Sequence, residues 1–360
     1  MNGEGPNSKV WLSAESEAGR IGTKGTRHVL ARLALVAGSL AISLAMLEVA
    51  LRIGGYAPSY ADPTMYSLTD DGRRYGLSAN WSGWYGGVWV RTNNLGLRGP
   101  ELPPTKGADE YRVVVLGDSV VFGQGVREEN TLSVKLEALL KPSLPSKRVV
   151  VINAGVPGYN TTTQREQLKR LWPVLRPDLV VLAYLVDNDS DVDTGIKVDP
   201  RTGALLTGFH YDSPLSRGSY FLHRHSRLYS FVRHRIRSFQ EAADAREGGA
   251  PQNMFSSDNQ GWQESQRALL EMSALCNREH VPFVVGLLGL VFRIQGADIV
   301  SAFSAQNGIR SVELWRTTDV KRFFEQYAVA SYDGHPNSRA HELMALRLAA
   351  YVRASIQPDS

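Results

Sequence analysis

The sequence predicts an α/β fold in which helices cover both faces of a parallel sheet, preceded by one N-terminal transmembrane helix. From residue 111 onward, short apolar runs rich in Val, Ile and Leu alternate with segments of helical periodicity, the pattern of strands joined by crossover helices. A chain of 360 residues with 43% hydrophobic content can also bury a large single core. We therefore predict one α/β domain at 111–355.

The elements of this domain follow in chain order. Strands are predicted at 111–116, 148–152, 179–184 and 281–288. Helices are predicted at 131–140, 161–172, 260–278, 296–306, 318–328 and 338–354. An insertion at about 195–258 interrupts the alternation, and its first part is predicted to be a basic amphipathic helix at 214–239. That helix could be a lid, a partner surface or a membrane-surface contact.

The N-terminal region contains the segment that predicts a membrane helix. Residues 29–53 are nearly all apolar, and no polar residue recurs every third or fourth position as it would on an amphipathic helix. Basic residues precede the segment and only Arg52 closely follows it, which predicts a cytoplasmic N-terminus and an extracytoplasmic domain, periplasmic or at the cell surface. Residues 1–28 are predicted to be a disordered cytoplasmic tail.

Residues 55–110 form a lead-in rich in glycine and aromatic residues, including Trp84 and Trp89. We predict a strap packed across the domain; the alternative is a lining of the substrate groove, because aromatic rings suit sugars. The net charge of +4, from 40 basic and 36 acidic residues, is too balanced to predict a nucleic-acid partner. The single cysteine, Cys276, excludes a disulfide within the monomer and is predicted to be a buried apolar residue.

The residues of chemical interest follow the predicted strands. The apolar run 113–116 leads into the turn Gly117-Asp118-Ser119, which places a serine at the carboxyl edge of the sheet. Such a serine is a nucleophile only if a base and oxyanion donors lie beside it. Gly155 and Asn188 each follow a later strand, and Asp333-Gly334-His335 precedes the last helix.

Ser, Gly, Asn and His in this order resemble the SGNH (GDSL-type) hydrolase family over most of the predicted domain. The resemblance implies a flavodoxin-like three-layer α/β/α sandwich and a serine esterase, with Ser119 as nucleophile, His335 as base and Asp333 orienting His335. It also implies an oxyanion hole formed by the backbone N–H groups of Ser119 and Gly155 and the side-chain amide of Asn188. The spacing Asp-x-His departs from the commoner Asp-x-x-His and resembles some sugar O-acetyltransferase relatives. This chemistry requires no metal and no organic cofactor.

Three functions remain open at this point. The first is hydrolysis of an ester, either an O-acetyl or other acyl group on an extracytoplasmic carbohydrate or another small ester. The second is transfer of the acyl group to a cell-surface polysaccharide by the same triad. The third is a catalytically silent glycan-binding or assembly protein. Asp187 is the reason to consider it, because its negative charge beside Asn188 would oppose binding of an oxyanion there.

Overall fold

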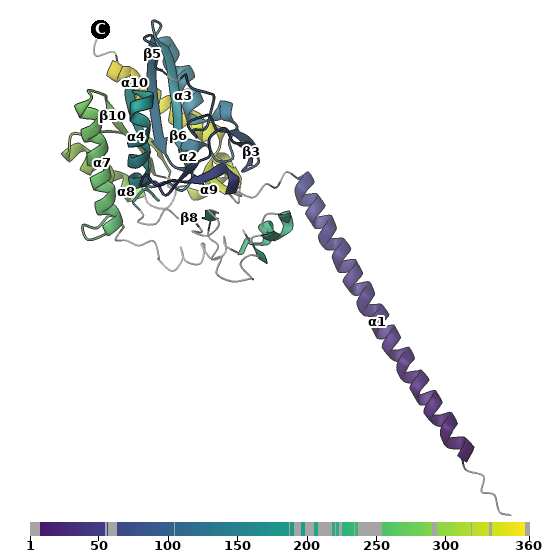
Figure 1. Ribbon diagram of the computed structural model, residues 1–360. Coiled ribbons are helices and arrows are strands. Elements are labelled where there is room, and N and C mark those ends of the chain that lie inside the picture. Colours follow the sequence, from purple (N-terminus) through teal and green to yellow (C-terminus); the bar gives the residue numbers. More distant parts are fainter. Residues whose placement is uncertain are drawn as a thin grey trace, which may run out of the picture.

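The computed structural model describes residues 8–54, 56, 63–103, 105–186, 188–190, 196–198, 205–207, 218–219, 221–222, 225–233, 235–236, 254–289, 294–317, 319–330 and 333–356, with no side chain before His28. A long helix, α1, projects from a domain built around one sheet (Figure 1).

The sheet confirms the predicted fold class. It contains five parallel strands in the order β11-β10-β7-β5-β6. Their bounds are β5 Glu110–Gly117, β6 Arg148–Gly155, β7 Leu179–Leu185, β10 Phe283–Gly289 and β11 Arg310–Arg316. This is the flavodoxin-like order, and the direction of the strand order reverses between β5 and β7. The crevice at the carboxyl ends of those two strands is therefore where such a sheet binds ligands.

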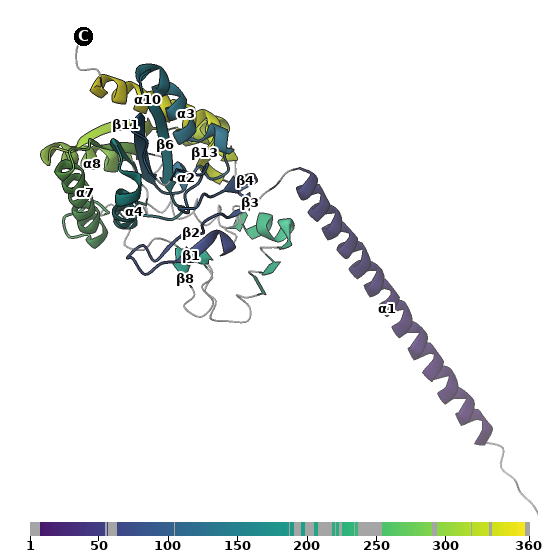
Figure 2. The same cartoon turned by 45° about the horizontal axis from the view of Figure 1, so that its top comes forward.

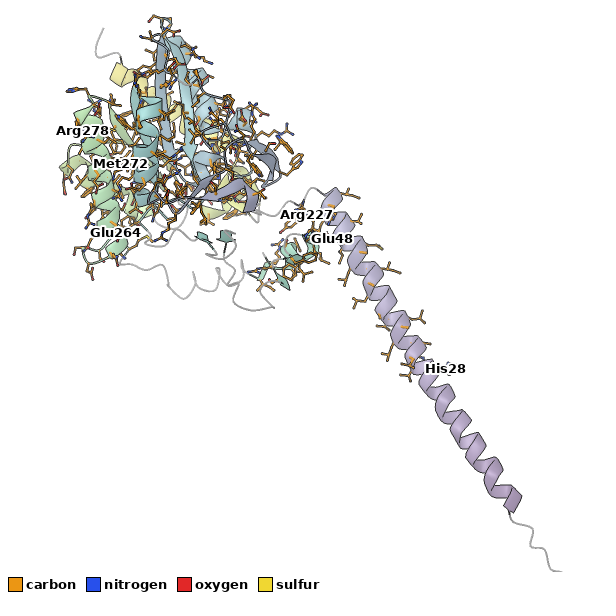
Figure 3. All side chains as sticks on the ribbon, viewed as in Figure 1. His28, Glu48, Arg227, Glu264, Met272 and Arg278 are labelled. Atoms are coloured by element: carbon orange, nitrogen blue, oxygen red, sulfur yellow. The ribbon has the colours of Figure 1, made fainter. Side chains whose placement is uncertain are left out.

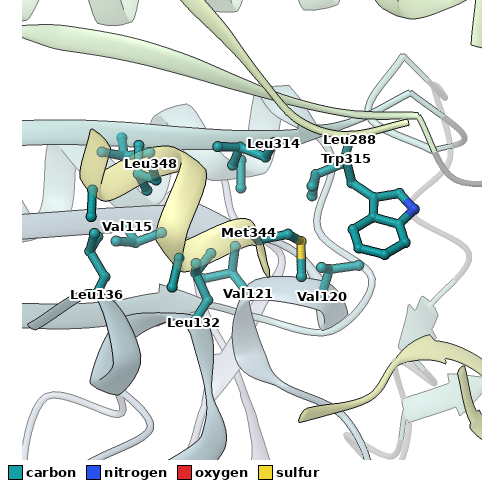
Figure 4. Packing of buried hydrophobic residues seen from close by; sticks show 14 of the residues in the cluster. Val115, Val120, Val121, Leu132, Leu136, Leu288, Leu314, Trp315, Met344 and Leu348 are labelled. Atoms are coloured by element: carbon teal, nitrogen blue, oxygen red, sulfur yellow. The ribbon is translucent and has the colours of Figure 1, made fainter. Parts of the chain in front are cut away.

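Helices cover both faces of the sheet. Those on one face are α3 Leu132–Leu140 and α10 Ser338–Ile356. Those on the other are α4 Thr161–Leu175, α7 Gln260–Arg278 and α8 Ile294–Gln306. In the first layer Leu132 and Leu136 of α3 lie near Met344 and Leu348 of α10, with Val115 of β5 in the same cluster (Figure 4). These buried apolar layers hold β5 rigid up to its carboxyl end.

Two predictions near the C-terminus were incomplete. Strand β11 was not predicted, and the helix predicted at 318–328 is the shorter α9 Val320–Gln326. The chain leaves α9 for an antiparallel hairpin of β12 Ala328–Ala330 and β13 Asp333–Pro336. The hairpin ends the helix because Ala328 pairs with Pro336 across it.

The lead-in is folded onto the domain. It contains two antiparallel hairpins, preceded by a 3-10 turn at Pro63–Met65: β1 Tyr66–Leu68 with β2 Tyr75–Leu77, and β3 Ser82–Tyr85 with β4 Val88–Arg91. Their buried side chains form one cluster with Phe122, Val156 and Tyr159, which lie just beyond the ends of β5 and β6. Tyr75 Oη donates to Pro157 O at 2.9 Å and Tyr159 Oη donates to Tyr75 O at 2.5 Å. The strap therefore covers the edge of the domain where the crevice lies.

Helix α1 spans Ser8–Ile53, so the prediction of a disordered tail at 1–28 is wrong for residues 8–28. No proline interrupts this stretch, and a helix already formed in the apolar part extends without a new nucleation step. Within it, His28–Ile53 has 26 residues and a mean hydropathy of 2.1, which is long and apolar enough to cross a membrane. A signal sequence near an N-terminus has the same properties, and the orientation of α1 stays a prediction.

The remaining described elements are short. They are α2 Ser119–Phe122, the 3-10 turns Glu128–Asn130 and Lys141–Ser143, and the antiparallel pair β8 Ile196–Val198 and β9 Leu205–Thr207. Residues 117–119, which lead into α2 and contain the predicted nucleophile, are called the nucleophile turn below. Much of the predicted insertion at 195–258 lies outside the described residues. Its helical residues 227–233 lie beside the C-terminal end of α1 in both views (Figures 1 and 2).

Candidate active site

Ser119 is the first residue of α2 and lies directly beyond the end of β5. Asp118 caps this short helix, with its Oδ1 accepting from the backbone N–H of Val120 at 2.8 Å. Gly117 permits the tight turn, because a Cβ there would lie 2.3 Å from Val121 Cγ2. The first N–H groups of any helix have no carbonyl partner within that helix. Among the described residues, no atom accepts a hydrogen bond from the backbone N–H of Ser119.

The structure brings the three predicted catalytic side chains together. His335 Nε2 lies 3.0 Å from Ser119 Oγ, and His335 Nδ1 lies 2.5 Å from Asp333 Oδ1. The short Asp-x-His spacing still allows the carboxylate to reach the imidazole, because Asp333 Oδ1 lies beside residue 335 of the same strand. This oxygen also accepts from the backbone N–H of His335 at 3.0 Å. The arrangement fixes the proton of neutral His335 on Nδ1 and leaves Nε2 as an acceptor facing the serine.

Asn337 fixes the position of the segment that carries His335. Its backbone N–H donates to Tyr327 O at 2.7 Å, and its Oδ1 accepts from the N–H groups of Arg339 and Ala340 in the first turn of α10. Helix α10 is itself held by the core, so the hairpin residue His335 has a rigid support.

The charges around His335 favour its protonated form. Burial lowers the pKa of His335, but the hydrogen bond and charge of Asp333 and the charge of Asp118 outweigh burial, and the pKa is raised above its ordinary value of 6.5. The pKa of Asp118 is in turn raised by burial, against the hydrogen bonds that it accepts from Val120 and Asn188. A positive charge on the His335 ring is thus stabilised by two carboxyl groups.

Gly155 lies against the nucleophile turn, but its N–H group already has a partner. That N–H donates to Asn153 Oδ1 at 3.1 Å. A Cβ on Gly155 would lie 2.4 Å from Phe122 N and 2.9 Å from Asp118 O, so the end of β6 and the turn touch backbone to backbone. The structure therefore gives Gly155 a packing role, and its predicted role as an oxyanion donor stays a prediction.

Gly158 is a candidate donor that the sequence analysis missed. It occupies the third position of a turn in which Tyr159 N–H donates to Val156 O at 3.1 Å, and its φ is 80°. Pro157 followed by a glycine with positive φ is the signature of a type II turn, so the dipeptide itself was the available signal. Gly158 is partly exposed, and among the described residues no atom accepts a hydrogen bond from its backbone N–H.

Asn188 links the end of β7 to the nucleophile turn. Its Nδ2 donates to Asp118 Oδ2 at 2.8 Å, which uses one of the two amide hydrogens. Its Oδ1 is buried with no partner among the described residues. Asp187 lies outside the described residues, so the prediction that its charge opposes an oxyanion beside Asn188 stays a prediction.

Arg98 of the lead-in supports the far end of α2, a role that no sequence pattern indicated. Only 3% exposed, it donates from Nη1 to Phe122 O and Gly123 O at 2.8 and 2.6 Å, and from Nη2 to Val126 O at 2.6 Å. The last carbonyls of a helix lack partners within it, and a cation there is favoured by the helix dipole. Arg98 therefore fixes the C-terminal end of the four-residue helix that begins at Ser119.

Fold and site together define a flavodoxin-like α/β domain with a hydrogen-bonded serine, histidine and aspartate at the switch point of its sheet. No family model matches the chain, and no curated protein matches it. Solved structures of hydrolases and esterases, including GDSL-type enzymes, are similar to it.

Three of these structures show the extent of the similarity. An α/β hydrolase from the metagenome of Lake Arreo is 13% identical, with 69% of this chain and 97% of that one covered and a TM-score of 0.39. A GDSL-like lipase from Bacteroides thetaiotaomicron is 13% identical, with 71% and 93% covered and a TM-score of 0.36. A two-domain esterase active on acetylated mannans is 13% identical, with 70% and 52% covered and a TM-score of 0.36. At such values the activity has to be argued from this chain's own residues.

Proposed function

We propose that this protein is a serine esterase. Ser119 Oγ attacks the ester carbonyl while His335 Nε2 takes its proton, and the same nitrogen then protonates the departing alcohol. Water then gives a proton to His335 Nε2 and its oxygen bonds to the acyl carbon. The bond from that carbon to Ser119 Oγ breaks, His335 returns the proton to Oγ, and the acid departs. The observation that carries the proposal is the 3.0 Å contact between Ser119 Oγ and His335 Nε2, with Asp333 on the opposite ring nitrogen.

The oxyanion of the tetrahedral intermediate needs donors beside Ser119. We assign the N–H groups of Ser119 and Gly158 and the second amide hydrogen of Asn188, since each lies two or three residues beyond the end of β5, β6 or β7. Val156 N–H donates to Gly117 O at 3.2 Å and Asn188 Nδ2 donates to Asp118, so both later segments are joined to the turn that carries Ser119. Gly158 is preferred to Gly155 because the Gly155 N–H group is bonded to Asn153. Each donor of this kind contributes about 2.7–4 kcal/mol to the transition state.

An acylated carbohydrate is the substrate class that the surroundings support. Trp84 and Trp89 are 68% and 53% exposed, and their rings meet edge to face at 5.8 Å across the β3–β4 hairpin. The tip of that hairpin touches the chain just after α2, where a Cβ on Gly86 would lie 3.1 Å from Gly125 N. Exposed indole faces next to the nucleophile helix suit stacking on sugar rings, as aromatic side chains do in ligand sites.

The nucleophile is tested on the full chain in detergent with a fluorophosphonate probe and a nitrophenyl acetate assay. Labelling and turnover should vanish in Ser119→Ala and persist in Ser133→Ala, since Ser133 is a buried serine of α3 outside the triad. A folded wild-type protein that neither labels nor turns over would overturn the proposal. Acyl transfer to an added oligosaccharide, detected by mass spectrometry, would identify an acyltransferase that uses the same serine.

The substrate class has its own test. Trp84→Ala should raise KM for an O-acetylated oligosaccharide and leave kcat/KM for nitrophenyl acetate unchanged, because the small ester does not extend to the hairpin. Equal effects on both substrates would argue against the tryptophan pair as a sugar platform.

A further inference from the structure

The C-terminal end of α1 is bonded to the insertion. The carboxylate of Glu48 accepts three hydrogen bonds, each 2.9 Å long, from Ser226 Oγ and from the backbone N–H groups of Arg227 and Leu228. One turn further on, Arg52 pairs with Glu48 and donates to His225 O at 2.9 Å. Figure 3 shows Glu48 and Arg227 side by side at this junction.

These contacts fix the start of the helical residues 227–233. The first N–H groups of a helix lack partners within it and carry partial positive charge. Here the carboxylate of Glu48 accepts from those of Arg227 and Leu228, and Ser226 Oγ accepts from that of Tyr229. Beyond this junction, Tyr56 meets Phe231 edge to face with ring centroids 5.5 Å apart. The helix of the insertion is therefore positioned by α1.

The position of Glu48 places this junction at a membrane boundary. The apolar stretch His28–Ile53 has 26 residues, which at 1.5 Å per residue is about 39 Å long, whereas the hydrocarbon core is about 30 Å thick. Glu48 lies 20 residues, about 30 Å, after His28, so a span that enters the hydrocarbon core at His28 has crossed it when the chain reaches Glu48. A carboxylate there lies in the headgroup layer when α1 spans a bilayer.

The described residues between 218 and 236, which are 218–219, 221–222, 225–233 and 235–236, combine exposed apolar and basic side chains. Phe221, Leu222, Val232 and Ile236 are 61%, 45%, 48% and 54% exposed. Val232 and Ile236 are four residues apart in the sequence, the spacing of side chains on one face of a helix. The basic residues of the described part are Arg227, Arg233 and Arg235. Exposed apolar side chains beside arginines are the composition of a helix that lies in a membrane interface.

We propose that the described residues between 218 and 236 form an interfacial element that lies on the leaflet at the C-terminal end of α1. Its exposed apolar side chains enter the boundary between headgroups and acyl chains, and Arg227 and Arg235 bind anionic lipid phosphates. Arg233 instead donates to Ser219 Oγ at 2.8 Å. The attachment to α1 through Glu48 favours this role over a lid or a protein-binding surface. This inference does not depend on the proposed esterase activity.

The test uses the full chain reconstituted in vesicles of phosphatidylcholine, with or without phosphatidylglycerol. Val232→Cys and Ile236→Cys carry an environment-sensitive fluorophore, and Lys141→Cys, 58% exposed on the domain, is the control. The native Cys276 is buried, and burial raises the pKa of its thiol to about 12, so it does not compete for the label. Spin-labelled lipids should quench positions 232 and 236 at least about twofold more than position 141, and more strongly with phosphatidylglycerol.

Glu48→Ala tests the attachment. It should reduce lipid quenching at position 232, while Glu48→Gln, which keeps one acceptor oxygen, should reduce it less. Lipid quenching at positions 232 and 236 equal to that at position 141 would overturn the proposal. Labels shielded from both lipid and aqueous quenchers would also overturn it, because they would indicate a contact with protein. Recovery of the mature protein without residues 1–53, measured by intact mass, would also overturn it, because Glu48 and its attachment would be absent.

Discussion

Gly155→Ala tests whether the backbone contact between β6 and the nucleophile turn controls activity. The new Cβ would lie 2.4 Å from Phe122 N and 2.9 Å from Asp118 O, whereas ordinary contacts begin at 3.4 Å. The turn must therefore move by about 1 Å, and a displacement of that size at a reacting atom can cost about 100-fold in rate. The N–H group of residue 155 is retained in this variant, so the loss would come from displacement of Ser119.

The assay is kcat/KM on nitrophenyl acetate together with the rate of fluorophosphonate labelling. A 100-fold loss corresponds to about 2.7 kcal/mol of transition-state stabilisation, and overpacking should lower the free energy of unfolding by about 1–3 kcal/mol. Gly334→Ala is the matched control, because its Cβ would make only an ordinary contact of 3.4 Å with Phe324. A folded Gly155→Ala protein with activity within about threefold of wild type would refute the reasoning.

Three further predictions concern the surroundings of the triad. Asp333→Asn removes a carboxylate that raises the pKa of His335, so the acidic limb of the kcat/KM profile should move to lower pH. The plateau value of kcat/KM should fall by about 10³–10⁴-fold, because the imidazole loses its fixed tautomer. Asn188→Ala should lower kcat for nitrophenyl acetate by about 10²–10³ with little change in KM, since the lost donor acts in the transition state. Arg98→Met removes three hydrogen bonds from a buried cation and leaves Val126 O with no other donor among the described residues, since Gly123 O and Phe122 O also accept from Val126 N–H and Asn153 Nδ2. The free energy of unfolding should fall by about 3 kcal/mol, measured by urea titration in detergent.

Each of these has a result that would contradict it. An acidic limb of Asp333→Asn that stays at the wild-type pH would mean that Asp333 does not set the pKa of His335. A rise in KM alone for Asn188→Ala would assign that amide to substrate binding. Arg98→Lys is the control for the third, and equal stability of Arg98→Met and wild type would show that the carbonyls find other donors.

Sequence periodicity predicted most of the sheet because its central strands are buried on both faces. Strand β7 has seven residues, all buried, and therefore appears as an uninterrupted apolar run. Strand β11 lies at the edge of the sheet, and its polar residues Arg310, Glu313 and Arg316 recur every third position. That spacing is closer to a helix than to a strand, and only the pairing with β10 shows the strand.

The site was predicted as far as local motifs extend. Ser119 and His335 each follow a local pattern, and the structure brings them together. The choice between Gly155 and Gly158 depended on where β6 ends, and the strand continues through Gly155. Strand boundaries are the least determined feature of a sequence pattern. Arg98 had no local signal, because its partners are 24 to 28 residues away and meet it only in the folded chain.

The charges of β11 also protect the protein against aggregation. An edge strand presents unpaired N–H and C=O groups to which a strand of another molecule can add. In β11 the exposed Arg310, Glu313 and Arg316 interrupt any apolar run, and Arg316 is paired to Asp298 of α8 at 2.5 Å. An approaching strand would have to strip water from these charges before it could pair. The charged residues that give β11 a helix-like sequence pattern therefore also oppose pairing of this edge strand with a strand of a second molecule.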